Sequence, residues 1–213
     1  MKKSFFITFD GPEGSGKSTH SAKLKDDLIV SGYEVVYTRE PGGTLLGQKI
    51  RDVLLKNEDI KLVKQAELLL FEADRAQHVE EIIKPALTSG KIVICDRFNT
   101  ATFAYQGYGA GMDINMIRNI DDSATSGIVP DITLILDVEV KTGLFRAGQR
   151  CAADKMEKRP CDFHERVRQG YLDIAGKFPE KIKIIQVKDN IDETYKFIKK
   201  EVYDFIERNK RSG

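Results

Sequence analysis

The chain has 213 residues, 41% hydrophobic and 31% charged, which is the balance of a globular protein and not of a disordered one. Its 34 Lys and Arg residues against 33 Asp and Glu give a formal net charge of +1, so charge favours neither a nucleic-acid partner nor a membrane. The three cysteines (Cys95, Cys151 and Cys161) have no C-x-x-C spacing, which argues against structural zinc and a disulfide scaffold. We therefore expect one cytoplasmic domain over residues 1–213, without a membrane span.

Strand and helix patterns alternate along the chain. Strands are predicted at residues 5–9, 34–39, 92–95, 132–138 and 182–187. A short helix that ends at about residue 55 is predicted after the loop at 41–43. The other helices are predicted at 18–31, 63–87, 101–105, 112–125, 140–148, 163–178 and 191–208. This order predicts an α/β fold in which helices cover both faces of a parallel sheet, with ligands at the carboxyl ends of the strands. The charged segment 146–160 has little apolar periodicity, and we expect it to be a mobile lid.

The first predicted strand is followed by a complete G-x-x-x-x-G-K-[ST] phosphate-binding loop (P-loop). Its residues are Gly11, Pro12, Glu13, Gly14, Ser15, Gly16, Lys17 and Ser18, and Thr19 follows them in the helix. The glycines let successive backbone N–H groups turn toward a triphosphate, and the helix that starts here adds its positive dipole end. Lys17 is placed to reach the β- and γ-phosphates, and the Ser18 hydroxyl to ligate Mg²⁺. We expect these nine residues to bind ATP.

The other motifs and the length of the chain narrow the class of P-loop protein. A guanine-reading N-K-x-D motif after a strand is missing from the sequence, so a GTPase is not expected. The chain is short for a motor or transporter ATPase. A small kinase needs a second anion site opposite the P-loop, with positive charge between the two.

Further blocks at the strand ends and on the long helix point to one kinase family. They are T-R-E-P-G-G-T at 38–44, F-E-A-D-R-A-Q at 71–77, D-R-F at 96–98 and T-F-A-Y-Q-G at 102–107. With the P-loop, they make the chain resemble thymidylate kinase, which phosphorylates dTMP to dTDP using ATP and Mg²⁺. The resemblance covers nearly the whole chain. It implies a P-loop nucleoside monophosphate kinase fold with a five-stranded parallel sheet.

The resemblance assigns base recognition to the long helix. Phe71 is expected to stack on thymine and Arg75 to donate to its O4 edge, a combination that excludes the amino group of cytosine. The alternatives are core packing for Phe71 and a surface ion pair with Glu72 or Glu80 for Arg75. We favour the site interpretation because the two residues lie four apart on one helical face.

The same resemblance assigns the sugar and the acceptor phosphate. Tyr105 is expected to crowd the ribose 2′ position, with Thr102 and Gln106 beside the base. Glu13 is expected near the acceptor 3′-hydroxyl or a bound cation. Arg97 is expected to clamp the dTMP phosphate, with Arg39 lining the same pocket. Asp96 is expected to hold Mg²⁺ through water, or to form a buried pair with Arg97. The residues assigned to catalysis are Lys17, Arg97 and Arg150.

The lid is the expected source of a mobile cation, since no basic residue occupies the four variable P-loop positions. Arg146, Arg150 and Lys155 are the candidates: Arg150 for catalysis and Arg146 for ATP binding. Asp154 and Glu157 match acids that close the lid region. Two departures from the family pattern are visible: Thr100-Ala101 stands in place of Asp-Ser, and Lys155 in place of Arg.

Other interpretations stay open on the sequence alone. A related kinase would act on another nucleoside monophosphate, and dUMP is a weaker acceptor candidate. A nucleotide-binding module without turnover is the alternative from another class. By resemblance the protein is expected to be a homodimer packed through helices such as 63–87.

Overall fold

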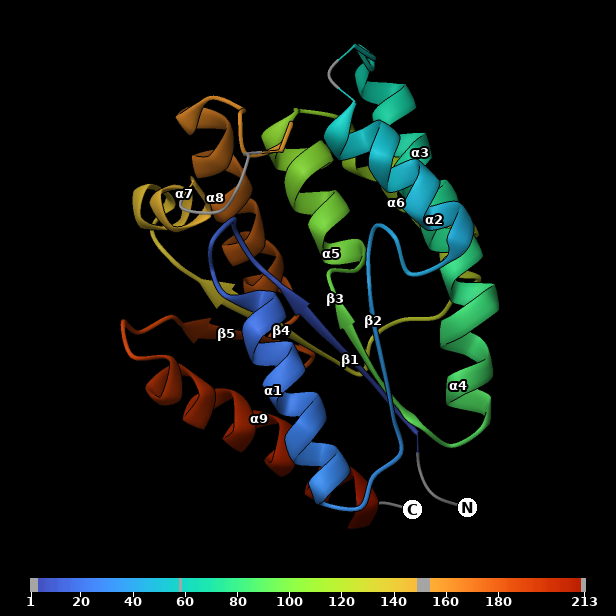
Figure 1. Cartoon of the computed structure of the whole chain (residues 1–213), viewed down its shortest axis with the longest axis vertical. Helices are drawn as coiled ribbons and strands as arrows, with labels where there is room; N and C mark the ends of the chain where they lie inside the picture. The colour runs from blue at the N-terminus through green and yellow to red at the C-terminus, as the bar shows by residue number, and fades with distance from the viewer. Residues whose placement is uncertain (1–3, 58, 149–153, 212–213) are drawn as a thin grey trace.

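The computed structural model describes residues 4–57, 59–148 and 154–211. A central sheet of five parallel strands runs through this part of the chain in the order β2-β3-β1-β4-β5 (Figure 1). The strands are β1 (Phe5–Asp10), β2 (Val35–Arg39), β3 (Ile92–Asp96), β4 (Ile132–Asp137) and β5 (Ile182–Gln186). The predicted fold class is therefore confirmed.

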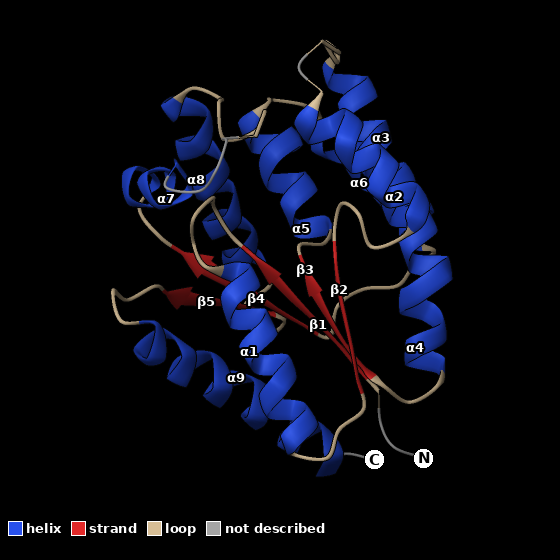
Figure 2. Ribbon diagram, viewed as in Figure 1, coloured by secondary structure: helices blue, strands red, loops and turns tan. Residues whose placement is uncertain are grey.

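Helices cover both faces of the sheet (Figure 2). They are α1 (Lys17–Val30), α2 (Leu45–Arg51), α3 (Lys64–His78), α4 (Lys84–Thr88), α5 (Asn99–Thr102), α6 (Ile114–Thr125), α7 (Val140–Gly148), α8 (Cys161–Lys177) and α9 (Ile191–Arg211). Three π-helical segments continue α2, α3 and α5: η1 (Asp52–Lys56), η2 (Val79–Ile83) and η3 (Phe103–Gly109). Among the described residues, no helix combines the length and apolarity needed to cross a membrane.

The central strands are buried on both faces because their side chains alternate between two cores. Ile7 and Phe9 of β1 point toward α1 and α9, where they join Leu28 and Ile198. Phe6, which comes directly before Ile7, points the other way, toward η2 and α4. Burial of such side chains contributes roughly 1.5–3 kcal/mol each. The sheet is thus a rigid platform whose carboxyl edge carries the loops.

The predicted long helix over 63–87 is one continuous run, but it does not keep α-helical hydrogen bonding. It begins at Lys64 and passes through the π-helical segment η2 before α4 ends it at Thr88. Pro85 lies just after η2 and has no N–H to give the carbonyl four residues earlier, which favours a change of hydrogen-bonding register there. The segment predicted as a short helix at 101–105 similarly runs from α5 into η3.

Candidate active site

The P-loop joins β1 to α1 at the carboxyl edge of the sheet. Lys17 is the first residue of α1, and its Nζ donates to the carbonyl oxygens of Gly11 and Pro12 at 3.0 and 2.7 Å. Gly14 has φ 66°, and a Cβ there would lie 2.0 Å from the Gly143 carbonyl oxygen. The loop therefore packs directly on the backbone of α7, a contact that only glycine permits. Gly143 was not identified from the sequence.

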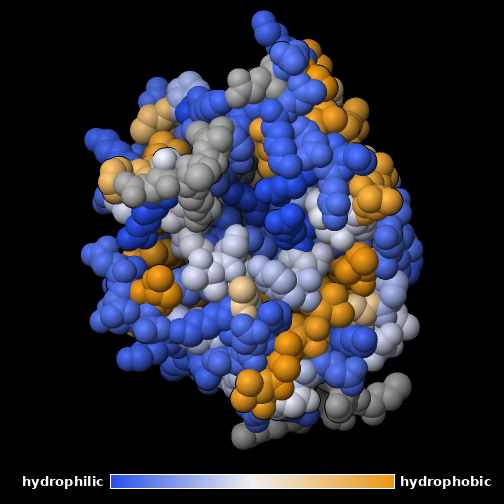
Figure 3. Space-filling model, in the orientation of Figure 1, coloured by the Kyte–Doolittle hydropathy of each residue, from blue (hydrophilic) through white to orange (hydrophobic). Residues whose placement is uncertain are grey.

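A central cavity opens in front of this loop and appears as a hydrophilic hollow in Figure 3. Its lining comes from the P-loop, the ends of β2 and β3, helix α3, the α5–η3 run and the residues after 153. The predicted residues that line it are Glu13, Gly14, Gly16, Lys17, Ser18, Arg39, Phe71, Arg75, Asp96, Arg97, Thr102, Tyr105 and Gln106. Chain segments far apart in the sequence therefore converge on one site.

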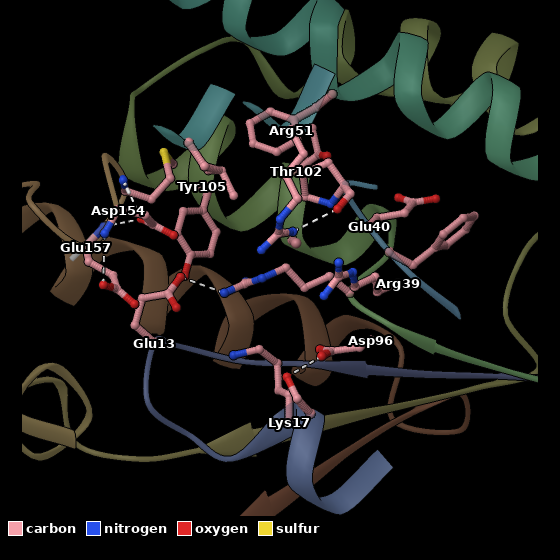
Figure 4. Close-up of a pocket in the computed structure, with 18 of the residues that line it drawn as sticks. Glu13, Lys17, Arg39, Glu40, Arg51, Asp96, Thr102, Tyr105, Asp154 and Glu157 are labelled. Atoms are coloured by element: carbon pink, nitrogen blue, oxygen red, sulfur yellow. Dashed lines mark hydrogen bonds and ion pairs between the residues drawn. The ribbon is translucent and has the colours of Figure 1, made fainter. Parts of the chain in front are cut away.

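Glu13 joins two of these segments. Its Oε1 accepts from Arg97 Nη2 at 2.6 Å and from the Tyr105 hydroxyl at 2.7 Å (Figure 4). Burial acts to raise the pKa of Glu13, but the positive charges of Arg97 and Lys17 outweigh it and hold the pKa at about 2. Arg97 has φ 72°, a left-handed conformation that costs a non-glycine residue roughly 1–2 kcal/mol. Such strain occurs mainly at functional positions.

The alternative prediction for Asp96, a buried ion pair with Arg97, does not match the structure. Arg97 pairs with Glu13, whereas Asp96 Oδ2 accepts from Ser18 Oγ at 2.5 Å. The hydroxyl of Ser18 and the carboxylate of Asp96 are oxygen ligands of the kind that Mg²⁺ prefers, directly beside the P-loop. These two residues therefore fit a magnesium ion held in part through water.

A buried acid lies beneath the P-loop. Asp10, the last residue of β1, is 0% exposed, and neither carboxylate oxygen has a hydrogen-bond partner among the described residues. Burial raises its pKa to about 7, although Arg97, Lys17 and the nearby Phe98 backbone offset part of that rise. Nothing in the sequence indicated this environment.

Arg75 lies at the opposite end of the cavity and is 2% exposed. Its Nε donates to Glu40 at 2.9 Å, Nη1 to Glu72 at 2.5 Å and Asp121 at 3.2 Å, and Nη2 to Thr102 Oγ1 at 3.0 Å. Arg75 does form the ion pair with Glu72 that was considered as an alternative, but this pair is buried and not on the surface. Burial acts to lower the pKa of Arg75, but the three carboxylates raise it overall.

Phe71 and Gln106 line the same cavity as this arginine. Phe71 is partly buried and packs against the core cluster that includes Tyr105, so it takes part in the core and lines the cavity at once. Gln106 Nε2 donates to Glu67 Oε1 at 3.1 Å. Thr100 is buried, and Ala101 lines the cavity. An acid beside Arg75 is nevertheless present, supplied by Asp121 of α6 instead of by position 100.

Two further arginines line the middle of the cavity. Arg39 ends β2, and its exposed side chain has no hydrogen bond or ion pair with another described residue. Arg51, which ends α2, donates to the Pro41 carbonyl at 2.8 Å. Burial lowers the pKa of Arg51, and the positive charges of Arg39 and Arg97 lower it further, so three guanidinium groups share this region. The sequence analysis missed Arg51, whose only signal was a basic residue ending the helix after T-R-E-P-G-G-T.

The remaining predicted residues lie outside the cavity lining. Gly11, Pro12 and Ser15 are buried in the P-loop backbone, and Thr19 is exposed on α1. Arg146 lies in the last turn of α7 and pairs with Asp189 at 3.2 Å. Arg150 lies outside the described residues, as does Cys151.

The described part of the segment 146–160 contacts both the cavity and η1. Asp154 and Glu157 line the cavity. Lys155 Nζ instead donates to the carbonyl oxygens of Val53 and Ile60 at 3.3 and 3.0 Å. Its charge is therefore directed at backbone carbonyls beside η1, which makes it a weaker candidate than Arg150 for the mobile cation.

Comparison with known proteins agrees with this geometry. The family model described as "Thymidylate kinase" matches residues 9–198. A curated thymidylate kinase of Desulfovibrio desulfuricans is 49% identical over 84% of this chain and 86% of its own. That of an Exiguobacterium species is 43% identical over 98% and 97% of the two chains. The crystal structure of thymidylate kinase from Ehrlichia chaffeensis superposes with a TM-score of 0.78 at 39% identity, covering 93% of this chain and 98% of its own. The chain belongs to the thymidylate kinase family.

Proposed function

We propose that this protein transfers the γ-phosphoryl group of ATP to dTMP, which yields ADP and dTDP. The observation that carries the proposal is the single cavity that joins the P-loop to the Phe71–Arg75 face of α3, with arginines between them. The two ends suit a triphosphate and a base, and the middle suits the two phosphates that react. The comparisons support thymidine as the nucleoside.

The acceptor is a phosphate oxygen that is already ionised, so the reaction needs no strong general base. Its main requirement is to bring two anions together and to neutralise charge as the phosphoryl group moves. We propose that Lys17 and the P-loop amides hold the transferring group, and that Arg39, Arg51 and Arg97 hold the acceptor phosphate. Mg²⁺ bound through Ser18 and Asp96 would neutralise charge on the ATP phosphates.

Base selection follows from the donors that Arg75 has left. A guanidinium has five N–H groups, and four of them are engaged by Glu40, Glu72, Asp121 and Thr102. One N–H on Nη2 has no partner among the described residues. We propose that it donates to the thymine O4 while Phe71 stacks on the ring. The amino group of cytosine would face this donor with donors of its own, which disfavours dCMP.

The sugar and the lid complete the proposed site. Tyr105, fixed by its bond to Glu13, is proposed to crowd the ribose 2′ position, with Thr102 and Gln106 beside the base. Glu13 is proposed to face the acceptor 3′-hydroxyl or a bound cation. In the lid, Arg146 is proposed to lie against adenine and Arg150 to supply charge in the transition state.

We further propose a homodimer formed through α3 and its neighbours. Large apolar side chains are exposed on α2, α3 and α6: Leu45, Leu46, Leu69 and Met116, with Val63 just before α3. Figure 3 shows apolar side chains gathering along the side of the molecule where α2 and α3 lie. A patch of this kind is typical of a protein–protein interface. Cys95 and Cys161 are free thiols, which agrees with the reducing cytoplasm that we propose as the location.

A nucleotide panel tests the proposed function. Purified protein with ATP and Mg²⁺ is offered each nucleoside monophosphate in turn, and ADP release is followed. We expect turnover with dTMP, weaker turnover with dUMP and none with dCMP. Preference for another monophosphate would identify a related kinase, and no turnover with any would favour a binding module.

A further inference from the structure

His78 holds both neighbours of the unpaired arginine Arg39. It is the last residue of α3 and is 0% exposed. Its Nε2 lies 2.6 Å from Thr38 Oγ1, and its Nδ1 lies 2.8 Å from Glu40 Oε1. A carboxylate only accepts, so Nδ1 carries a proton and donates to Glu40. Residues 38 and 40 are therefore both fixed to one imidazole ring.

This arrangement determines the direction of Arg39. Side chains alternate at the end of a strand, so Thr38 and Glu40 both contact His78 of α3, while Arg39 points to the other face and lines the cavity, which Glu40 also borders. β2 is an edge strand that pairs only with β3. Pairing on one side leaves the strand end free to twist about its own axis, since twist is larger and less constrained at edges. The two bonds to His78 restrain that twist from the side-chain face.

The loop after β2 is seated on the same ring. A Cβ on Gly43 would lie 2.5 Å from both Cδ2 and Nε2 of His78. Asp74, which lies four residues before His78 on α3, accepts a hydrogen bond from the Gly42 amide at 3.0 Å. At Gly43 the backbone thus lies too close to α3 for any side chain other than hydrogen.

We propose that His78 is a positioning residue that directs Arg39 toward the acceptor phosphate. This inference rests on the proposed function. The phosphate end depends on the His78 contacts because Arg39 has no other described partner. The base end does not depend on the His78 contacts. Arg75 keeps its hydrogen bonds to Glu72, Asp121 and Thr102 when the hydrogen bond between His78 and Glu40 is removed. Removal of the imidazole hydrogen bonds is therefore expected to separate phosphate affinity from nucleoside affinity.

The test compares dTMP with thymidine, the nucleoside that lacks the phosphate. In His78→Phe the ring is kept and both hydrogen bonds are lost. Since one buried hydrogen bond contributes about 1 kcal/mol or more, we expect the Kd for dTMP to rise about 10-fold. The Kd values for thymidine and ATP should change less than about 2-fold, because their proposed contacts are retained. Binding is measured by calorimetry on the full chain.

Two further variants keep the result decisive. Val79→Ala removes buried volume from the next residue of the same run, which does not line the cavity, and controls for general destabilisation. Thr38→Val removes one of the two hydrogen bonds at nearly constant volume and serves if His78→Phe does not fold; it should weaken dTMP but not thymidine. Equal losses for dTMP and thymidine, or an unchanged dTMP Kd, would overturn the inference. If the unmodified protein bound no dTMP, the proposed function itself would fail.

Discussion

The two ends of the cavity hold their cations in opposite ways. At the base end, Arg75 is buried and surrounded by three carboxylates, so negative charge exceeds positive. At the phosphate end, the cations Lys17, Arg39, Arg51 and Arg97 face the acids Glu13 and Asp96, with Asp154 and Glu157 also on the lining, so negative charge does not exceed positive. An anion is therefore less favoured at the base end than at the phosphate end. The difference orients a nucleoside monophosphate before any specific contact forms.

The difference between the two ends also separates residues that stabilise the fold from residues available to a ligand. The bonds of Arg75 are made within the protein and must be kept for folding. The charges at the phosphate end are only partly neutralised, which costs stability and leaves them available to a ligand. Substitutions at the two ends are therefore expected to affect different measurements.

The largest effect is expected for Lys17→Ala at the phosphate end. Loss of the charge beside the transferring group should lower kcat on the order of 10³-fold or more. The circular dichroism spectrum should be unchanged, because Lys17 bonds only to P-loop atoms in the structure. Lys25→Ala, a partly exposed lysine on the same helix, is the control and should turn over normally. Normal turnover in Lys17→Ala would refute the P-loop assignment.

Arg75→Ala tests the base end, and its main effect is expected on folding. The substitution removes the buried cation shared by Glu40, Glu72 and Asp121, which costs about 3–5 kcal/mol. Urea denaturation monitored by fluorescence measures the loss. Arg168→Ala provides the comparison, since Arg168 pairs with a single carboxylate, Asp137, and is partly exposed. A smaller loss in Arg75→Ala than in Arg168→Ala would contradict the structural role.

This expectation illustrates what the sequence could not predict. The sequence located Arg75 on the same helical face as Phe71, and that spacing was enough to place both at the cavity. Its partners Glu40 and Asp121 come from the loop after β2 and from α6, 35 and 46 residues away. No local pattern links such positions. The P-loop was predictable because all of its function is contained in eight consecutive residues, whereas Arg51 and Asp10 become meaningful only through neighbours that the fold supplies.

Asp10→Asn tests the buried acid beneath the phosphate end. The folded-state pKa of about 7 lies above the unfolded value of 3.8, so unfolding releases a proton between these pH values. The contribution of Asp10 to stability is therefore lost as pH rises from about 4 to 7. The variant cannot titrate, so relative to it the unmodified protein should lose on the order of 3–4 kcal/mol across that window.

Thermal and urea unfolding at pH 4.5, 6 and 7.5 measure this difference. Asp26→Asn, which replaces an exposed acid on α1, is the control for the loss of one carboxylate. A constant difference between parent and Asp10→Asn at all three pH values would show that Asp10 keeps an ordinary carboxyl pKa.

Arg150→Ala tests the lid as the source of mobile charge. We expect kcat to fall about 100-fold with little change in the KM for dTMP, because the contact should form mainly in the transition state. Lys155→Ala is a control within the same segment, since Lys155 Nζ is bound to carbonyl oxygens near η1. The reverse result, with Lys155→Ala impaired and Arg150→Ala normal, would reassign the catalytic cation and keep the lid.

The smallest effect is expected for Arg39→Ala, and it is the sharpest test of the contrast between the two ends. Arg39 has no described partner, so its removal should leave the free energy of unfolding unchanged, unlike Arg75→Ala. A charge-assisted hydrogen bond to phosphate would be lost, which should raise the KM for dTMP about 10-fold. Arg118→Ala, an exposed arginine of α6 that does not line the cavity, should change neither measurement. If Arg39→Ala lowered stability as Arg75→Ala does, the phosphate end would also be a structural network, and the division of roles between the two ends would be wrong.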